Sequence, residues 1–275
     1  MLDCAGKPLD LSVPRVMGIL NVTPDSFSDG GHFIDVAAAV TRARTMVEEG
    51  AAIIDVGGES TRPGAAAATV QEELDRVLPV IEALVAELPV PVSVDTGKPE
   101  VMRAAVAAGA GMINDVYALR QPGALAAAAA LGVPVCLMHM QGEPRTMQQA
   151  PHYDDVVAEV AGFLAHRVAA CEQAGIVRSR LLLDPGFGFG KSLEHNLALL
   201  RHLPDLLAPG LPLLVGMSRK SMIGAVLDTP LAGRLHGSVA AATLAAWLGA
   251  SIVRVHDVKA SADALKMVAA VQAAD

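Results

Sequence analysis

The sequence predicts a single-domain α/β protein, a TIM barrel of the (β/α)₈ type, because three observations agree. Short β-type apolar runs alternate with longer Ala/Leu/Val-rich segments that carry charges at helical spacing, which is typical of βα units around a parallel sheet. Eight such units can be counted along the chain. The length of 275 residues, with 52% hydrophobic residues, matches one such barrel and allows a large buried core.

The predicted strands are almost continuously apolar, as expected for strands covered on both faces in a barrel or a doubly wound sheet. They are Val16–Leu20, Ala52–Val56, Val92–Val94, Met112–Asp115, Val135–Met138, Leu181–Asp184, Leu213–Gly216 and Ile252–Val255. No linker or change in composition divides the chain, so residues 1–275 are predicted to form one domain. Residues 1–15 precede the first unit and are expected to cap the lower end of the barrel.

Helices are predicted in the gaps between these strands. The clearest apolar stripes lie in Glu72–Leu88, Asp154–Gly175 and Ser238–Ala250. Gly175 and Gly249 stand where helix C-terminal ends are expected. The Ala126–Ala130 run could be low-complexity sequence, but alanine is the strongest helix former and the run falls in a helical position, so we interpret it as helix.

Composition narrows the class of protein. The formal net charge of −8 and the absence of any Lys/Arg run argue against a nucleic-acid partner. Cys4, Cys136 and Cys171 form no C-x-x-C pair and are interpreted as buried apolar side chains in a reducing compartment. No basic N-terminal region precedes a sustained apolar stretch, and no apolar run is long enough to span a membrane. We therefore predict a cytoplasmic protein.

The glycine-rich stretch "DPGFGFGKS", residues 184–192, resembles a nucleotide-binding loop but fails both standard patterns. The first glycine position of a P-loop is occupied by Pro185, which has no N–H group to offer a phosphate. A G-x-G-x-x-G motif that begins at Gly186 would end at Lys191. The stretch therefore predicts close backbone approach to a ligand instead of a phosphate cradle.

The side chains of the same stretch fit that interpretation. Phe187 and Phe189 are placed to flank a planar ring. Lys191 and Ser192 are interpreted as opening the next helix, without a role in binding.

Polar residues follow or end most of the predicted strands, where the active sites of parallel barrels lie. This set comprises Asn21, Asp55, Asp95, Asn114, Asp184, Ser218, Arg219, Lys220, Arg254 and His256. Each one alone could be a turn or helix-cap residue, and for Asp95 in "DTG" that alternative stays open. Together they indicate a ligand site, because buried charges this close need partners.

The set divides into two chemical halves. Asp95, Asn114, Asp184 and Lys220 suit the edge of a flat, nitrogen-rich heterocycle, because a carboxylate can pair with an amino group and a ring N–H. The other half suits a phosphate and comprises Asn21, Thr61, Arg254 and His256. A heterocycle that carries a phosphate leaving group is the implied ligand.

Two long loops, residues 21–33 and 57–69, are predicted to act as lids over this face, although disordered surface loops are an alternative. Charged and polar residues in them would meet a second substrate, and apolar ones would supply the closed contact surface. The loop residues concerned are Asp25, Phe27, Thr61, Arg62 and Pro63.

Eight motifs spread over almost the whole chain closely resemble the dihydropteroate synthase family of bacterial folate biosynthesis. They are "MGILNVTPDSFSDGG", "DVGGESTRPGA", "SVDT", "INDV", "LMHMQG", "DPGFGFGK", "GMSRKSMIG" and "RVHDV". The resemblance implies a TIM barrel that joins 6-hydroxymethyl-7,8-dihydropterin diphosphate to 4-aminobenzoate, giving 7,8-dihydropteroate and diphosphate. The undisturbed "STRPGA" and "GFGFGKS" segments imply the sulfonamide-sensitive type, and the family suggests a homodimer, with 238–250 and 260–274 as its helical surface.

The resemblance also implies a role for each site residue. The pterin would be held by Asp95, Asn114, Asp184, Lys220 and Phe189. The diphosphate would be held by Asn21, Thr61, Arg254 and His256, with a Mg²⁺ ion bound through Asn21. The 4-aminobenzoate pocket would comprise Arg62, Pro63, Ser218, Phe189 and Lys220, closed by Asp25 and Phe27. The expected catalytic residues are Asp95, Lys220, Arg254, His256 and Asn21.

The implied chemistry is loss of diphosphate before attack by the arylamine, so the barrier is chiefly electrostatic. The arylamine is neutral at pH 7 and needs no strong base, and His139 is interpreted as a structural strand-end residue. One alternative is a pterin-dependent corrinoid methyltransferase, which would have no use for Arg254 and His256. The other is a non-catalytic pterin-binding relative, against which the intact Asn21 and Lys220 argue.

Overall fold

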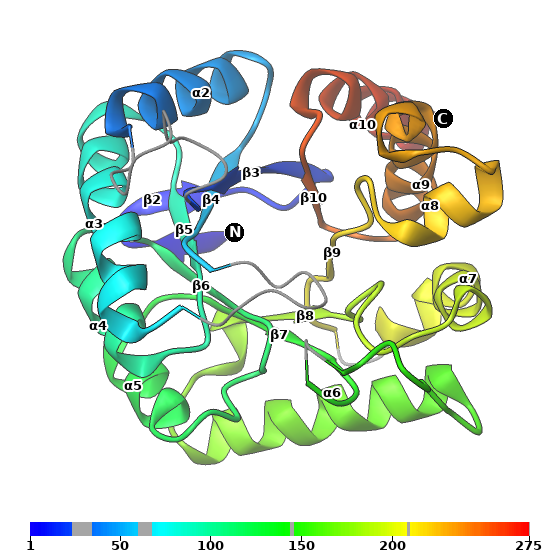
Figure 1. Cartoon of the computed structure of the whole chain (residues 1–275), viewed down its shortest axis with the longest axis horizontal. Helices are drawn as coiled ribbons and strands as arrows, with labels where there is room; N and C mark the ends of the chain where they lie inside the picture. The colour runs from blue at the N-terminus through cyan, green and yellow to red at the C-terminus, as the bar shows by residue number, and fades with distance from the viewer. Residues whose placement is uncertain (24–34, 60–67, 144–145, 208–209, 275) are drawn as a thin grey trace.

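Eight parallel strands form a barrel surrounded by helices in the computed structural model, which describes residues 1–23, 35–59, 68–143, 146–207 and 210–274 (Figure 1). The strand order is β8-β7-β6-β5-β4-β3-β10-β9, and a parallel bridge between Leu183 and Leu213 joins the two ends of the sheet. This confirms the predicted TIM barrel. The strands are β3 (Arg15–Asn21), β4 (Ile53–Gly57), β5 (Val92–Asp95), β6 (Met112–Asp115), β7 (Val135–Met138), β8 (Leu181–Asp184), β9 (Leu214–Val215) and β10 (Ile252–Val255).

All eight predicted strands are present: four have the predicted bounds, and the other four differ by one residue at one or both ends. Alternate side chains of each strand face opposite sides. On β3, Val16 and Leu20 belong to the large core between strands and helices, whereas Met17 belongs to a separate cluster with the other strand starts. Both sides of the strands are therefore apolar, which explains the near-continuous hydrophobic runs. Each fully buried Leu or Ile contributes about 1.5–3 kcal/mol.

An antiparallel hairpin precedes the barrel, formed by β1 (Leu2–Cys4) and β2 (Lys7–Leu9). Leu2, Cys4 and Leu9 are buried in the cluster that contains the first residues of several barrel strands. The Lys7 ammonium donates to the Leu88 carbonyl at 2.7 Å. The hairpin thus covers the end of the barrel opposite the polar rim, and the apolar cluster excludes water from that end.

The helices are α2 (Val36–Glu48), α3 (Val70–Glu87), α4 (Pro99–Ala107), α5 (Ala124–Leu131), α6 (Val156–Gln173), α7 (Leu193–Arg201), α8 (Ser221–Leu227), α9 (Leu235–Trp247) and α10 (Val258–Gln272). The three predicted helices are confirmed as α3, α6 and α9, and the alanine run lies inside α5. Thr69 begins α3 with a capping box to Glu72. Gly175 and Gly249 follow α6 and α9 with φ of 88° and 105°, as a helix stop requires.

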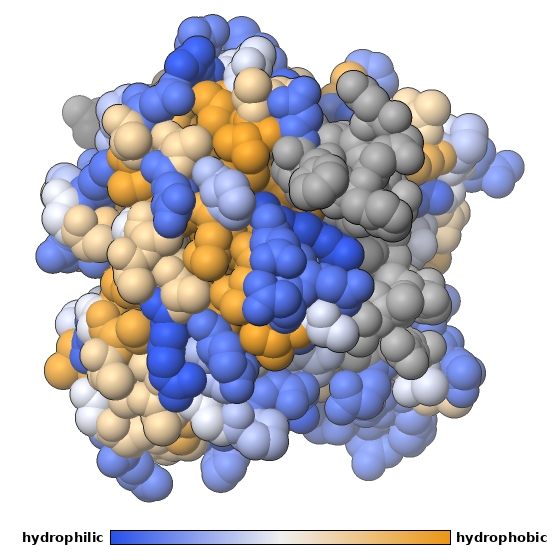
Figure 2. All heavy atoms as spheres, turned by 60° about the vertical axis from the view of Figure 1, so that its left-hand side comes forward, coloured by the Kyte–Doolittle hydropathy of each residue, from blue (hydrophilic) through white to orange (hydrophobic). Residues whose placement is uncertain are grey.

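The outer surface is that of amphipathic helices. Figure 2 shows one side of the molecule, where hydrophobic and hydrophilic residues lie next to one another. Cys4, Cys136 and Cys171 are buried and unpaired, as predicted. Within the described ranges, no helix is both long and apolar enough to cross a membrane.

Candidate active site

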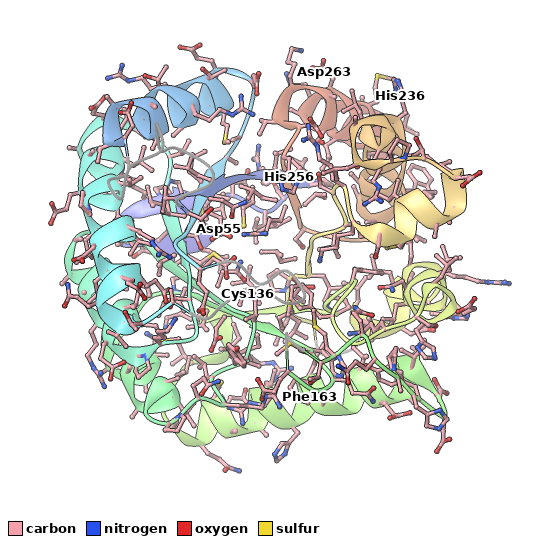
Figure 3. All side chains as sticks on the ribbon, viewed as in Figure 1. Asp55, Cys136, Phe163, His236, His256 and Asp263 are labelled. Carbon is pink, nitrogen blue, oxygen red and sulfur yellow. The ribbon has the colours of Figure 1, made fainter. Side chains whose placement is uncertain are left out.

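The polar residues predicted at the strand ends converge inside the ring of helices. Figure 3 shows Asp55 and His256 toward the centre of the molecule, whereas Phe163, His236 and Asp263 lie among the outer helices. The parallel register sets Asp95 of β5 beside Asn114 of β6. These positions follow from the topology, because the carboxyl ends of all eight strands meet at one rim.

A charged network on β4, β5, β6 and β10 forms the centre of the site. Arg254 donates through Nε to Asp55 at 2.6 Å and through Nη2 to Asp95 at 2.7 Å. Asn114 donates to the same Asp55 oxygen, Oδ2, at 3.0 Å. Asp55 is fully buried. The network places two carboxylates, one guanidinium and one amide at a single point of the rim. The sequence predicted a common rim for Asp95, Asn114 and Arg254, but it assigned Arg254 to the phosphate half, whereas the structure pairs Arg254 with the carboxylates.

Burial and the neighbouring charges perturb the ionisation of this network. Burial raises the pKa of Asp95 to about 7, an increase that Arg254 opposes and Asp55 reinforces. Burial alone would lower the pKa of Arg254, but Asp55 and Asp95 outweigh it and hold that pKa above its ordinary value. Asp95 therefore titrates near neutral pH beside a permanent cation.

The network corrects two expectations. Asp95 is not a helix cap, because α4 begins after Lys98 and the Asp95 carboxylate accepts from Arg254. Sequence reasoning placed Asp55 at the rim but assigned it no role, although Asp55 joins Arg254 to Asn114. The signal for Asp55 was its carboxylate inside an otherwise apolar strand, since a buried charge needs a partner.

Lys220 and Asp184 lie at the adjacent part of the rim. The Lys220 ammonium donates to the Phe187 carbonyl at 2.5 Å and lies 4.5 Å from the centroid of the Phe189 ring. Burial lowers the pKa of Lys220 to about 8, although Asp184 opposes this. Asp184 is 6% exposed, accepts from the Gly186 N–H at 2.7 Å, and has its pKa raised by burial. A ligand at this part of the rim would therefore meet the Lys220 cation, the face of the Phe189 ring and the Asp184 carboxylate.

The loop between β8 and α7 is held by a hydrogen bond to each of five successive carbonyl groups. Lys191 donates to Gly186 at 3.0 Å and to Phe189 at 3.1 Å. The remaining three carbonyls, in chain order Phe187, Gly188 and Gly190, accept from Lys220, Gln148 and Tyr153. Lys191 is 3% exposed, so its interpretation as a residue that only opens the next helix is wrong. Ser192 does cap α7 as predicted.

The glycines of this loop allow a close approach to the backbone of a neighbouring strand end, and one of its aromatic rings departs from the prediction. Gly186 has φ of 70°, and an added Cβ would lie 1.9 Å from the His139 carbonyl oxygen. Phe187 is fully buried in the large core, so it cannot flank a ligand ring. Phe189 remains half-buried beside Lys220 and is available for that purpose.

His139 is a buried structural residue, in agreement with its interpretation from the sequence. Its Nδ1 lies 2.9 Å from the Lys191 ammonium, and its ring meets Phe163 edge-on at 4.8 Å between centroids. Burial and the Lys191 charge lower the pKa of His139 to about 3, so the ring is neutral and accepts from Lys191.

The predicted diphosphate end lies between β3 and β10. The His256 ring nitrogen Nδ1 and its backbone N–H lie 3.1 and 3.2 Å from the Ser218 hydroxyl oxygen. Asn21 ends β3, next to Gly57. A pocket of about 250 Å³ opens here, and its lining includes Asn21, Arg42, Met46, Arg219, His256 and Asp257. Asp25, Phe27, Thr61, Arg62 and Pro63, also predicted for this site, lie outside the described residues.

The comparisons with known proteins first define the class. Residues 17–256 match a family model described as pterin binding enzyme. A relative from Escherichia coli strain K12, dihydropteroate synthase, is 59% identical over 269 residues, covering 98% of this chain and 95% of that relative.

Solved structures agree with this class. One of a dihydropteroate synthase from Xanthomonas albilineans with 4-aminobenzoic acid is 62% identical, has a TM-score of 0.94, and matches 100% of this chain and 98% of that one. Another, of the Yersinia pestis enzyme in a sulfonamide complex, is 56% identical with a TM-score of 0.93 and covers 97% of both chains. The chain therefore belongs to the dihydropteroate synthase family of transferases.

Proposed function

We propose that this chain condenses 6-hydroxymethyl-7,8-dihydropterin diphosphate with 4-aminobenzoate, releasing 7,8-dihydropteroate and diphosphate. The observation that carries the proposal is the buried network of Arg254, Asp55, Asp95 and Asn114, which lies at the strand ends of a pterin-binding barrel. Asp184 and Lys220 occupy the same rim, and Arg254 draws close to both carboxylates of the network. Such a set suits a flat ring with several N–H donors.

In this proposal the pterin lies against the carboxylate half of the rim. Asp95 and Asp184 accept from the amino group and ring N–H groups of the pterin, and Asn114 donates and accepts along the same edge. Lys220 donates to a ring acceptor, with Phe189 beneath it. The hydrogen bond from Arg254 keeps Asp95 oriented, and the ionised form of Asp95 is the one that binds.

The reaction proceeds by heterolysis of the C–O bond between the pterin methylene group and the diphosphate. The bonding electron pair leaves with the diphosphate, and His256 and Arg254 stabilise the charge that grows there. Asp95 lies near the delocalised cation that remains on the pterin. The nitrogen of 4-aminobenzoate then attacks the methylene carbon and releases a proton to water. We propose that Ser218, Lys220 and Phe189 line this second pocket, whereas Arg62 and Pro63, which the sequence also predicted for it, lie outside the described residues.

Magnesium fits the diphosphate end through oxygen ligands. The Asn21 amide offers one such oxygen at the end of β3, and we propose that it holds Mg²⁺ together with the substrate's own phosphate oxygens. In the parts of the chain that the structure describes, no cluster of three His, Cys, Asp or Glu residues could cage a metal alone. When bound, Mg²⁺ supplies charge neutralisation of the diphosphate.

The test is a turnover assay of the full chain with the dihydropterin diphosphate, MgCl₂ and 4-aminobenzoate. We expect 7,8-dihydropteroate by chromatography and an equal amount of diphosphate, and a sulfonamide should compete with 4-aminobenzoate. A second reaction without 4-aminobenzoate distinguishes the alternatives. Neither a corrinoid methyltransferase nor a silent pterin-binding protein would form dihydropteroate, so absence of that product from a folded sample refutes the proposal.

We also propose that the chain is a cytoplasmic homodimer. The buried free thiols of Cys4, Cys136 and Cys171 suit a reducing compartment. Helices α9 and α10 pack together and expose large apolar side chains, among them Trp247 at 54% and Met267 at 65%. Light scattering after gel filtration should give a dimer for the wild type and a monomer for Trp247→Glu.

A further inference from the structure

The pocket beside α2 contains a cation that the predicted diphosphate residues do not include. Arg42 comes from the middle of α2 and donates through Nη2 to the His256 carbonyl at 3.3 Å. Its Nη1 lies 3.9 Å from Glu49, and no other hydrogen bond or ion pair of Arg42 is formed within the described part of the chain. A guanidinium has five N–H donors, so Arg42 lines the pocket with most of its donors available.

The other two arginines of this region are already neutralised by carboxylates. Arg219 makes a two-pronged pair with Asp257, with Nε at 2.9 Å and Nη2 at 2.5 Å. Arg254 is held between Asp55 and Asp95. Arg42 has only Glu49 at the edge of ion-pair distance, so it is the least compensated of these three cations.

We propose that this pocket binds the terminal phosphate group of the diphosphate, with Arg42 as its principal cation. The inference rests on the proposed function, which supplies a diphosphate at Asn21 and His256, both of which line the same pocket. A volume of about 250 Å³ accommodates a phosphate group with ordered water. Arginine suits this ligand because its planar fork matches two phosphate oxygens at once.

The chemistry explains why such a cation is useful. Charge builds up on the diphosphate as the C–O bond breaks, and Arg254 is shared with two carboxylates that diminish its field. Arg42, which contacts the His256 carbonyl and lines the pocket, attracts the terminal phosphate into that pocket. Arg42 thereby separates the departing anion from Asp55 and Asp95, which would repel it.

The test compares Arg42→Gln with Arg44→Gln, a matched control on the same helix. Arg44 is exposed and pairs with Glu87, away from the pocket. Calorimetric titration with inorganic diphosphate and MgCl₂ measures binding without turnover. We expect Arg42→Gln to raise the diphosphate Kd about 10- to 100-fold, the range for loss of a hydrogen bond between charged groups. The Michaelis constant for 4-aminobenzoate should not change, and Arg42→Lys should recover part of the affinity.

Two results would refute the proposal that this pocket binds the terminal phosphate through Arg42. One is a diphosphate Kd for Arg42→Gln within about twofold of the wild type, in a variant whose circular dichroism and melting temperature are unchanged. The other is an equal loss of diphosphate affinity in Arg44→Gln, which would show that any positive charge on α2 has the same effect. Failure of the proposed function is separate, because a wild type that binds diphosphate but forms no dihydropteroate refutes that function and leaves the Arg42 comparison valid.

Discussion

Replacement of Asp55 by Asn isolates the charge at the centre of the network. The substitution keeps the shape of the side chain, and its remaining oxygen can still accept from Arg254 and Asn114, as Oδ2 does now. What is lost is a negative charge on a fully buried residue. Arg254 keeps Asp95 as a partner, so no cation is left alone.

The structure sets the size and direction of the effect. The hydrogen bond from Asn114 changes from charge-assisted to ordinary, and the one from Arg254 loses its anionic acceptor, at about 1 kcal/mol each, so the free energy of unfolding should fall by about 2 kcal/mol. This corresponds to a melting temperature lower by about 4 to 8 °C for a chain of this size. The Asp55 charge also raises the pKa of Asp95, which stands at about 7. Removing that charge lowers this pKa and leaves Asp95 ionised over a wider range.

The assay is kcat/KM for the dihydropterin diphosphate as a function of pH. If the ionised form of Asp95 binds the pterin, kcat/KM falls as pH drops through the Asp95 pKa. The acid limb of the wild type should therefore lie near pH 7, and that of Asp55→Asn at lower pH. Asp263→Asn, on the exposed face of α10, is the matched control and should leave the limb in place. An acid limb that stays fixed or moves upward in Asp55→Asn contradicts the reasoning.

Lys220→Ala should reduce kcat/KM about a thousandfold by removing a positioned donor, and wild-type rates in steady-state assays would contradict its assignment. In the wild type, kcat/KM should decline above about pH 8 as Lys220 loses its proton. Lys220→Arg should abolish this alkaline decline, and a decline that persists in Lys220→Arg would exclude Lys220 as its cause. Gly186→Ala should prevent native folding because of its clash with His139, whereas Gly175→Ala, with a similar φ of 88° and open space, should cost about 1–2 kcal/mol in denaturant unfolding. An equal loss of unfolding free energy in Gly186→Ala and Gly175→Ala would show that backbone strain, and not the clash with His139, accounts for the effect.

The part of the site that could be predicted from sequence is the part that strand ends dictate. Asp95, Asn114, Asp184 and Arg254 each lie in a short apolar strand, so the barrel topology alone brings them to one rim. Their chemical types then indicate the ligand. The resemblance of the motifs to a known family added the particular reaction, because the positions and charges of the rim residues do not specify it.

Side-chain direction within loops could not be predicted in this way. Phe187 and Phe189 are equivalent in the pattern "GFGFG", yet one enters the core and the other lies beside Lys220. The difference arises because Gly186 and Gly188 both have positive φ, which redirects the chain at each step. Lys191 likewise turns inward to the loop carbonyls, a choice that depends on His139 from another strand.

The sequence by itself determined three things: the local periodicity, the order of the strands along the chain, and the chemical type of each rim residue. All three depend on residues that are close together in the chain. Which cation pairs with which carboxylate was decided only by the tertiary structure. Arg254 lies between Asp55 and Asp95, nearly 200 and 160 residues away, while Arg42 reaches the carbonyl of His256. Such pairings are set by distances across the closed barrel, and no pattern along the chain encodes those distances.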